Sequence, residues 1–198
     1  MASKVGIANS ALIKLGAARI IALTDDNKNA KLCNEQYDKM RLDLLRSHNW
    51  NFSVTRIKMA QLTTAPTFEW DHAYQLPADW LRTISVHGDD AGVSNIRYRV
   101  ERGNILADHD DVWLRYVADI TDVGLFDASF AECLAWRLAL DLAIAITQSN
   151  PTFERMGVGL KDAVRAAKAT DAIEDYPEQP PESAWITARG GGDDWTGF

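Results

Sequence analysis

The chain has 198 residues, of which 46% are hydrophobic and 25% are charged, as in an ordinary globular protein. This length suits one domain with an insertion better than two full domains, and a core of this size can fold without disulfides or metals. The formal net charge of -7 argues against a protein that wraps nucleic acid, because neutralising phosphates requires clustered Lys and Arg. An acidic wall past which DNA slides is compatible with this charge.

The cysteines and the most apolar segments bear on where the protein is made. Cys33 and Cys133 each lie in an apolar helical pattern and are expected to be reduced core thiols, with a disulfide as the alternative. The N-terminus leads directly into an amphipathic helix, without the features of a signal peptide. Residues 133–146 are interrupted by Arg137 and Asp141 and are too short to span a bilayer. We therefore expect a protein that is made in the cytoplasm and does not enter a membrane.

Helical periodicity predicts two helices near the N-terminus. Residues 3–15 place apolar side chains at helical spacing, and Gly16 is expected to end this helix. A second helix is predicted at about residues 27–48, with the hydroxyl and carboxyl groups of residues 24–26 as capping acceptors. Its single apolar stripe predicts that one face is buried.

Between residues 50 and 125 the helical pattern gives way to short apolar segments separated by turns. Strands are predicted at residues 83–87, 96–101, 105–107 and 112–117, with turns at residues 89–92 and 102–104. These segments indicate a small antiparallel β region inserted between helices.

Helical periodicity returns at Asp127, where Ser129 and Glu132 have the spacing of a capping box. The helix predicted at about residues 128–149 is apolar on nearly all sides. Its own bundle or a neighbouring subunit must therefore cover it.

A last helix is predicted to run from Pro151 to about residue 175, with Asn150 as its cap. Gly157 and Gly159 should weaken its first turns. The predicted fold class is therefore α+β, mainly α. An antiparallel helical bundle is formed by two separate segments, an antiparallel β region is inserted between them, and an extended arm follows. The corresponding ranges are 1–49 and 126–176 for the bundle, 50–125 for the β region and 177–198 for the C-terminal arm.

The C-terminal arm combines prolines and glycines with large apolar side chains, among them Trp185, Ile186, Trp195 and Phe198. These side chains cannot form a core of their own, and exposed they would favour aggregation. Large aromatic residues are common anchors of protein interfaces, and a flexible arm can fold onto its partner. The arm is therefore predicted to insert into a partner protein; packing against its own bundle is the alternative.

No catalytic or cofactor-binding motif is recognisable, so we expect no enzyme and assign no catalytic, cofactor-binding or metal-binding residues. The acidic residues at 108–111 are the best metal candidate, but they lack the glycine and the distal glutamate of a calcium loop, which favours a solvated turn. Arg97, Arg99 and Arg102 flank Tyr98 on a predicted strand. A half-exposed strand is favoured there over a nucleic-acid interface.

The order of several short motifs carries a resemblance to a known family. They are residues 41–52 (RLDLLRSHNWNF) preceded by Ala30, Cys33 and Tyr37, then residues 9–16 and 20–25, residues 74–77 with Leu81 and Arg82, and residues 121–126. Over roughly residues 5–170 the chain resembles the tail tubular protein A family, the head-to-tail adaptors of short-tailed bacteriophages. The C-terminal arm lies outside this match.

The resemblance implies a structural protein of the virion, located at the head–tail junction. Such subunits form a ring, dodecameric in this family, between the portal protein and the tail nozzle, with DNA passing through the bore as cargo during ejection. In that setting the arm would bind the portal, and a second set of residues would face the nozzle or a neighbouring subunit: Trp70, Trp80, Tyr98 and Trp113. The alternatives are a head-completion or stopper protein of another tailed phage, or a small metal- or ligand-binding domain that uses residues 108–111.

Overall fold

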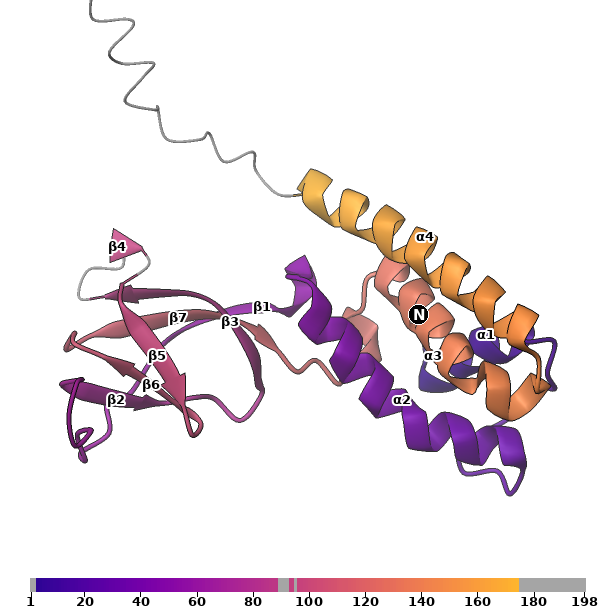
Figure 1. Cartoon of the computed structure of the whole chain (residues 1–198), viewed down its shortest axis with the longest axis horizontal. Helices are drawn as coiled ribbons and strands as arrows, with labels where there is room; N and C mark the ends of the chain where they lie inside the picture. Colours follow the sequence, from indigo (N-terminus) through magenta and orange to yellow (C-terminus); the bar gives the residue numbers. More distant parts are fainter. Residues whose placement is uncertain (1–2, 89–92, 95, 175–198) are drawn as a thin grey trace, which may run out of the picture.

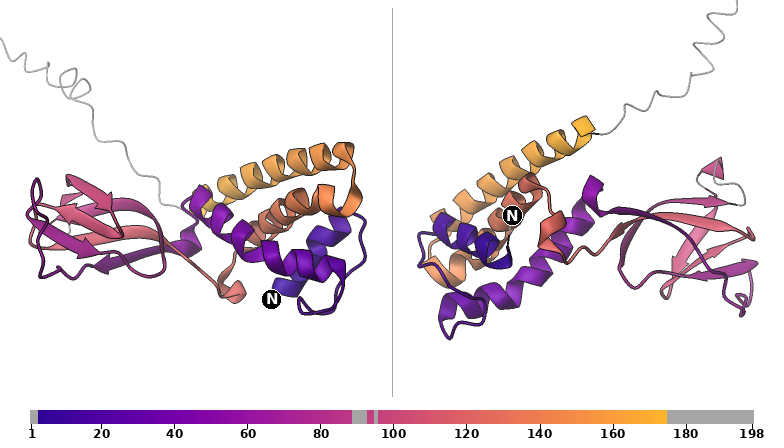
Figure 2. Two further views of the ribbon diagram at one scale, coloured as in Figure 1. Left: turned by 60° about the horizontal axis from the view of Figure 1, so that its bottom comes forward. Right: turned by 180° about the vertical axis from the view of Figure 1, so that it is seen from behind.

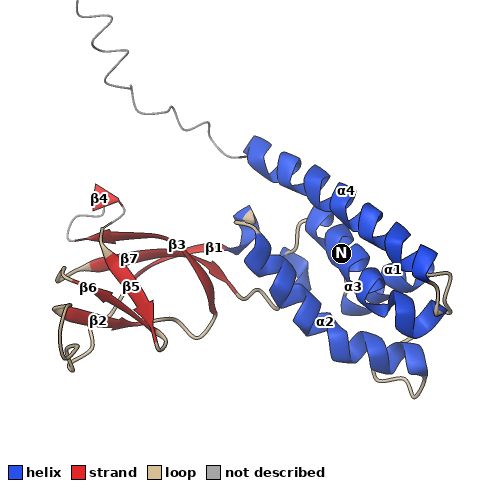
Figure 3. Cartoon of the chain, in the orientation of Figure 1, coloured by secondary structure: helices blue, strands red, loops and turns tan. Residues whose placement is uncertain are grey.

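The computed structural model describes residues 3–88, 93–94 and 96–174. Within these residues a helical bundle and a β part lie end to end (Figure 1), and the β part is inserted between the second and third helices. Figure 3 shows that the helices and the strands are cleanly separated between the two parts. The predicted class, α+β and mainly α, is confirmed.

The bundle contains the four α-helices among the described residues, α1 (Lys4–Lys14), α2 (Lys28–Ser47), α3 (Ala128–Thr147) and α4 (Asn150–Glu174). The central helix is α3, and α1, α2 and α4 pack around it (Figure 2). Phe130, Leu134 and Leu138 of α3 are fully buried in this core. The apolar α3 is therefore covered mainly by its own bundle, which was one of the two alternatives.

The side chains that cap the last three helices differ from the predicted ones. An oxygen of each cap accepts a backbone N–H of the first turn: Asn27 for α2, Asp127 for α3 and Ser149 for α4. Ser129 does not cap α3 because its hydroxyl donates to Asp127, and Asn150 is already part of α4. Asp25 instead closes the preceding loop by accepting from the backbone N–H of Ile21 at 2.9 Å.

The β part consists of two antiparallel sheets. A four-stranded sheet has the order β1-β7-β3-β4, and a three-stranded sheet has the order β2-β6-β5. The strands are β1 (Val54–Lys58), β2 (His72–Gln75), β3 (Trp80–Gly88), β4 (Val93–Ser94), β5 (Tyr98–Glu101), β6 (Asn104–Ala107) and β7 (Val112–Ala118). One apolar core, separate from that of the bundle, is shared by both sheets and includes Tyr74, Ile105 and Leu114.

The predicted strands are present, but β3 begins at Trp80 and β5 at Tyr98, and β1, β2 and β4 were not predicted. The turn predicted at residues 102–104 is confirmed: Arg102 and Gly103 have φ of 48° and 79°, as a tight hairpin turn between β5 and β6 requires. The turn predicted at residues 89–92 lies outside the described residues.

Two further predictions concern the core and the membrane. Cys33 and Cys133 are both buried free thiols, as predicted. None of the described helices has both the length and the apolar character that crossing a bilayer demands. The predicted C-terminal arm, residues 177–198, lies outside the described residues.

Candidate functional site

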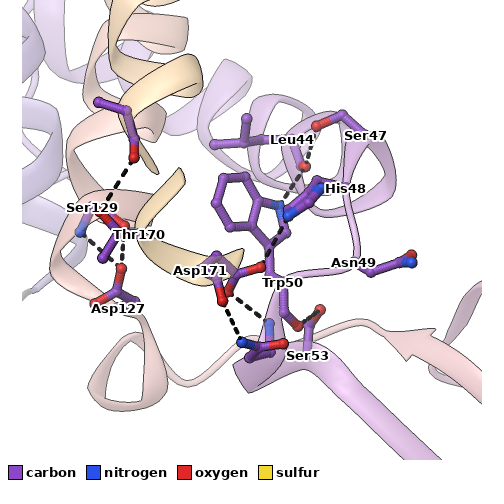
Figure 4. A network of polar contacts seen from close by, with 12 residues as sticks. Leu44, Ser47, His48, Asn49, Trp50, Ser53, Asp127, Ser129, Thr170 and Asp171 are labelled. Atoms are coloured by element: carbon purple, nitrogen blue, oxygen red, sulfur yellow. Dashed lines mark hydrogen bonds and ion pairs between the residues drawn. The ribbon is translucent and has the colours of Figure 1, made fainter. Parts of the chain in front are cut away.

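The two parts meet where α2 ends, and Asp171 of α4 holds this joint together (Figure 4). Its Oδ2 lies 2.9 Å from Nε2 of His48, the residue that ends α2. Its Oδ1 accepts from the backbone N–H of Asn51 at 3.0 Å, and its backbone oxygen accepts from the Asn51 side chain at 2.9 Å. The end of α4 is thereby attached to the segment that leads from α2 into β1.

The turn between α2 and β1 is anchored in the bundle core by Trp50. The indole is 1% exposed, and its N–H donates to the backbone oxygen of Leu44 at 3.0 Å. Its ring meets that of Phe130 edge to face, with 5.2 Å between the centroids. Ser53 is also buried and donates to the backbone oxygen of Trp50 at 2.9 Å. Buried donors with partners of this kind give a turn one well-defined conformation.

The chain passes between the two parts a second time, from β7 back to α3. Arg41 of α2 holds this second crossing. The guanidinium is almost fully buried, forms an ion pair with Asp119 and donates to the backbone oxygen of Ile120 at 2.8 Å. Its Nε also donates to Asp38 at 3.1 Å. Burial disfavours the charge, but the hydrogen bonds to Asp119 and Asp38 outweigh it, and the pKa of Arg41 lies above its usual value. Both segments that connect the two parts are therefore anchored to the bundle by buried or partly buried side chains.

Three of the four aromatic residues predicted to face the nozzle or a neighbouring subunit have local packing roles. Trp70 is 7% exposed and lies beneath the guanidinium of Arg97, 4.5 Å from the ring centroid. Trp80 is half-buried and donates to the hydroxyl of Thr83 at 3.1 Å, and Tyr98 packs against the β core. All three therefore have contacts within the chain, and their contact with a nozzle or a neighbouring subunit stays a prediction.

The fourth residue, Trp113, lies in a cationic surface that the sequence did not reveal. On the outer face of the four-stranded sheet, Trp113 is paired with Lys58 of β1 and His87 of β3. The next row on the same face pairs Arg56 of β1 with Arg115 of β7. We call these five residues the basic face; a shallow hollow on it is lined by all five. The alternation of cations at residues 56 and 58 was its only sequence signal.

A different surface lies at the opposite end of the molecule. The backbone oxygen of Ala145 accepts from Lys28 at 2.7 Å, so the start of α2 lies beside the end of α3. At this distal end, which is farthest from the β part in Figure 1, Ile21, Ile144 and Phe153 are 92%, 45% and 44% exposed. Exposed large apolar side chains also lie elsewhere, since Phe68 in the β part and Ile173 near the end of α4 are 79% and 83% exposed. The distal end is therefore one of several candidate surfaces for protein–protein contact.

Three acidic residues in the range 108–111 each contact a different neighbour. The carboxylate of Asp110 is 3.0 Å from His72, and that of Asp111 is 2.8 Å from Lys58. The carboxylate of Asp108 accepts from the backbone N–H of Asp71 at 3.2 Å. Within the described part of the chain, no three His, Cys, Asp or Glu side chains are placed to hold a metal ion.

The arginines of β5 and of the loop before it are similarly paired. Arg97 lies 3.3 Å from Glu69, and Arg99 lies 3.0 Å from Glu101. Local carboxylates therefore offset much of their charge, which weakens the case for a nucleic-acid interface there.

The predicted portal-binding residues, Trp185, Ile186, Trp195 and Phe198, lie outside the described residues. No protein-family model matches the chain, and a comparison with curated proteins finds no match.

Proposed function

We propose that this chain is a structural protein of a tailed-phage virion, the head-to-tail adaptor that forms a ring between the portal and the tail nozzle. The observation that carries the proposal is the hydrogen-bonded joint between the two parts. It connects two bodies with separate cores into one elongated subunit, with an apolar surface at one end and a basic, aromatic surface toward the other. A connector needs such a subunit, because it must bind different partners at its two ends while keeping their axes aligned.

The location of the family-like motif supports the proposal. The longest stretch that resembles tail tubular protein A proteins, residues 41–52, contains Arg41, His48 and Trp50. These side chains make the contacts that hold the joint. The resemblance therefore lies in residues that determine how the two parts are oriented.

In the proposed ring, subunits contact one another through unlike surfaces and close by rotation. The C-terminal arm binds the portal, with Trp185, Ile186, Trp195 and Phe198 as anchors. Because every subunit contributes one arm, weak single contacts add up through avidity. Trp113 and the rest of the basic face belong to the surface that meets the nozzle or the neighbouring subunit. The acidic bore lets DNA pass without binding it.

The experiment is electron microscopy of the full-length chain mixed with the portal protein of the same virus. We expect a ring seated on the portal for the full chain, and no such ring for a chain that ends at Pro181. A chain with alanine at Trp185, Trp195 and Phe198 should behave like the truncated one, whereas alanine at Thr187 and Thr196 should leave binding unchanged.

Two results would contradict the proposal. Failure of the full chain to form a ring with the portal would exclude the adaptor role. Equal portal binding by the full and truncated chains, each with the same circular dichroism spectrum, would exclude the arm as the docking element.

A further inference from the structure

The basic face contains an unfavourable pairing. Arg56 and Arg115 lie directly opposite each other on β1 and β7, where side chains on the same face of a sheet are close neighbours. Neither guanidinium forms an ion pair with a carboxylate among the described residues. Like charges in this position destabilise a sheet. In a chain whose net charge is -7, two adjacent unpaired arginines indicate a site for an anionic group.

The neighbouring row adds an aromatic surface to this charge. Trp113 is only half-buried, and the ammonium group of Lys58 lies 5.0 Å from the centroid of its ring. His87 lies on the other side of Trp113 in the same row. The hollow on this face therefore has an aromatic floor with Arg56 and Arg115 as the unpaired cations beside it, because Lys58 already contacts the carboxylate of Asp111 at 2.8 Å. Such a surface suits an extended segment that carries both carboxylates and aromatic side chains.

Residues 175–198 of this chain have that composition. They contain five acidic side chains and one basic one, at Asp175, Glu178, Glu182, Asp193, Asp194 and Arg189. They also contain Trp185, Trp195 and Phe198, and exposed side chains of this size favour aggregation. The segment thus complements the basic face in charge, and docking there would cover its aromatic residues.

The segment also begins close to the sheet. Asp171, three residues before the end of α4, is hydrogen-bonded to Asn51, which lies three residues before the start of β1. The first strand is an edge strand and carries Arg56 and Lys58. Because an extended chain spans up to about 3.3 Å per residue, the segment can reach any point on this face, and also a neighbouring subunit.

We propose that the acidic, aromatic segment 175–198 docks on the basic face, through its carboxylates to Arg56 and Arg115 and through a tryptophan to Trp113. This docking does not require a portal. In an adaptor it would shield the arm before assembly, and a partner would then have to displace it. Nucleic acid is the less favoured occupant, because a net charge of -7 opposes its approach.

The test uses the full-length chain with one added cysteine, Ser183→Cys, carrying a nitroxide spin label. Cys33 and Cys133 are buried, so the label should react at the added thiol. We expect loss of NMR amide signal intensity at Arg56, Lys58 and Arg115, with recovery when the label is reduced. The charge-reversal variant Arg56→Glu with Lys58→Glu should recover these intensities. The matched control, Arg155→Glu with Lys161→Glu on exposed positions of α4, has the same change in charge and should not.

A mixture of two chains shows which subunit supplies the arm. One chain is isotope-labelled and has no nitroxide, and the other carries the nitroxide and is not isotope-labelled. Signal loss in that mixture means that a neighbour's segment docks on the basic face. Signal loss only when both labels are in one chain means that the chain's own segment docks. Both results support the proposal. Absence of signal loss in the parent chain, or its persistence after charge reversal at Arg56 and Lys58, would overturn it. So would preferential binding of duplex DNA to the basic face with no signal loss from the arm. None of these results depends on portal binding.

Discussion

Oδ2 of Asp171 lies 2.9 Å from Nε2 of His48, and this contact connects the end of α4 to the end of α2 across 123 positions of the sequence. The same carboxylate accepts from the backbone N–H of Asn51 at 3.0 Å. One side chain of α4 therefore fixes both the end of α2 and the first residues of the path into the β part.

The first prediction is that Asp171→Ala lowers the free energy of unfolding by about 1–3 kcal/mol, because partly buried donors at His48 and Asn51 lose their acceptor. The measurement is urea denaturation followed by tryptophan fluorescence. The control is Asp162→Ala on the same helix, whose exposed carboxylate lies 3.0 Å from the guanidinium of Arg165. It should change stability by less than about 0.5 kcal/mol. Equal effects of the two changes would show that Asp171 has no special role.

The second prediction concerns Arg41, which holds the other crossing. Arg41→Ala removes a buried cation that contacts Asp38, Asp119 and the backbone oxygen of Ile120. The carboxylates left behind, Asp119 and Asp38, are 27% and 58% exposed, so water can solvate them. The loss should therefore be about 1–3 kcal/mol, and the variant should unfold at a lower denaturant concentration. Arg41→Lys should recover only part of the loss, because an ammonium group cannot reach acceptors on both sides as a guanidinium does.

The matched control for Arg41 is Lys39→Ala on the same helix. Lys39 is exposed and lies 3.5 Å from Glu35, a surface pair of the kind that contributes less than about 1 kcal/mol. A loss at Arg41 no larger than that at Lys39 would contradict the view that the buried guanidinium fixes the crossing.

Helices were predictable from the sequence because their apolar stripes depend on nearby residues. All four were expected within a few positions of their observed ends, and α3 was recognised as the most apolar of them. The caps were misassigned because several adjacent residues, such as Asp127 and Ser129, carry suitable oxygens, and only the geometry of the chain selects one. The contacts of His48 with Asp171 connect residues too distant for any local pattern to reveal.

The β part was less predictable because its strands pair across long separations. Val54 of β1 lies opposite Val117, and Ala73 of β2 lies opposite Leu106, so short strands with weak alternation gain their stability from distant partners. The basic face was missed for the same reason, since its residues come from β1, β3 and β7. Among the predicted aromatic contacts, Trp113 alone lies on that face, and sequence patterns could not separate it from the packed Trp70.

The third prediction is alkaline destabilisation caused by the two core thiols. Burial raises the pKa of Cys33 from 9.0 to about 11, and burial with nearby carboxylates raises that of Cys133 to about 11. Between these values the unfolded chain releases thiol protons that the folded chain retains, so the unfolded state is favoured increasingly as the pH rises. The stabilisation is complete below about pH 9 and is lost as the pH approaches 11.

The measurement is the free energy of unfolding from pH 8 to pH 10, compared with a variant that carries Cys33→Ala and Cys133→Ala. The parent should lose stability over this range, and the variant should be less stable at pH 8 but lose less as the pH rises. Tyr37 and Tyr116, whose pKa values burial raises to about 12, contribute mainly above pH 10. Parallel curves for parent and variant would contradict an origin in the thiols.

The fourth prediction compares two glycines of α4 that are both expected to weaken a helix. A Cβ at Gly159 would lie 2.3 Å from Cζ3 of Trp136, whereas a Cβ at Gly157 would meet only Cδ1 of Leu140 at 3.9 Å. Alanine in a helix is more stable than glycine by about 1 kcal/mol. Gly157→Ala should therefore raise the free energy of unfolding by up to that amount.

Gly159→Ala should have the opposite sign, because the added methyl group displaces the Trp136 ring from its place between the two helices. Overpacking of this kind costs about 1–3 kcal/mol, which exceeds the gain in helix propensity. The ring also holds the ammonium group of Lys14 at 4.8 Å from its centroid, so its displacement should loosen the contact with α1 as well. Thermal unfolding of the two variants measures the difference directly. If both variants were stabilised, α4 would not pack against α3 as closely as the glycine at position 159 implies.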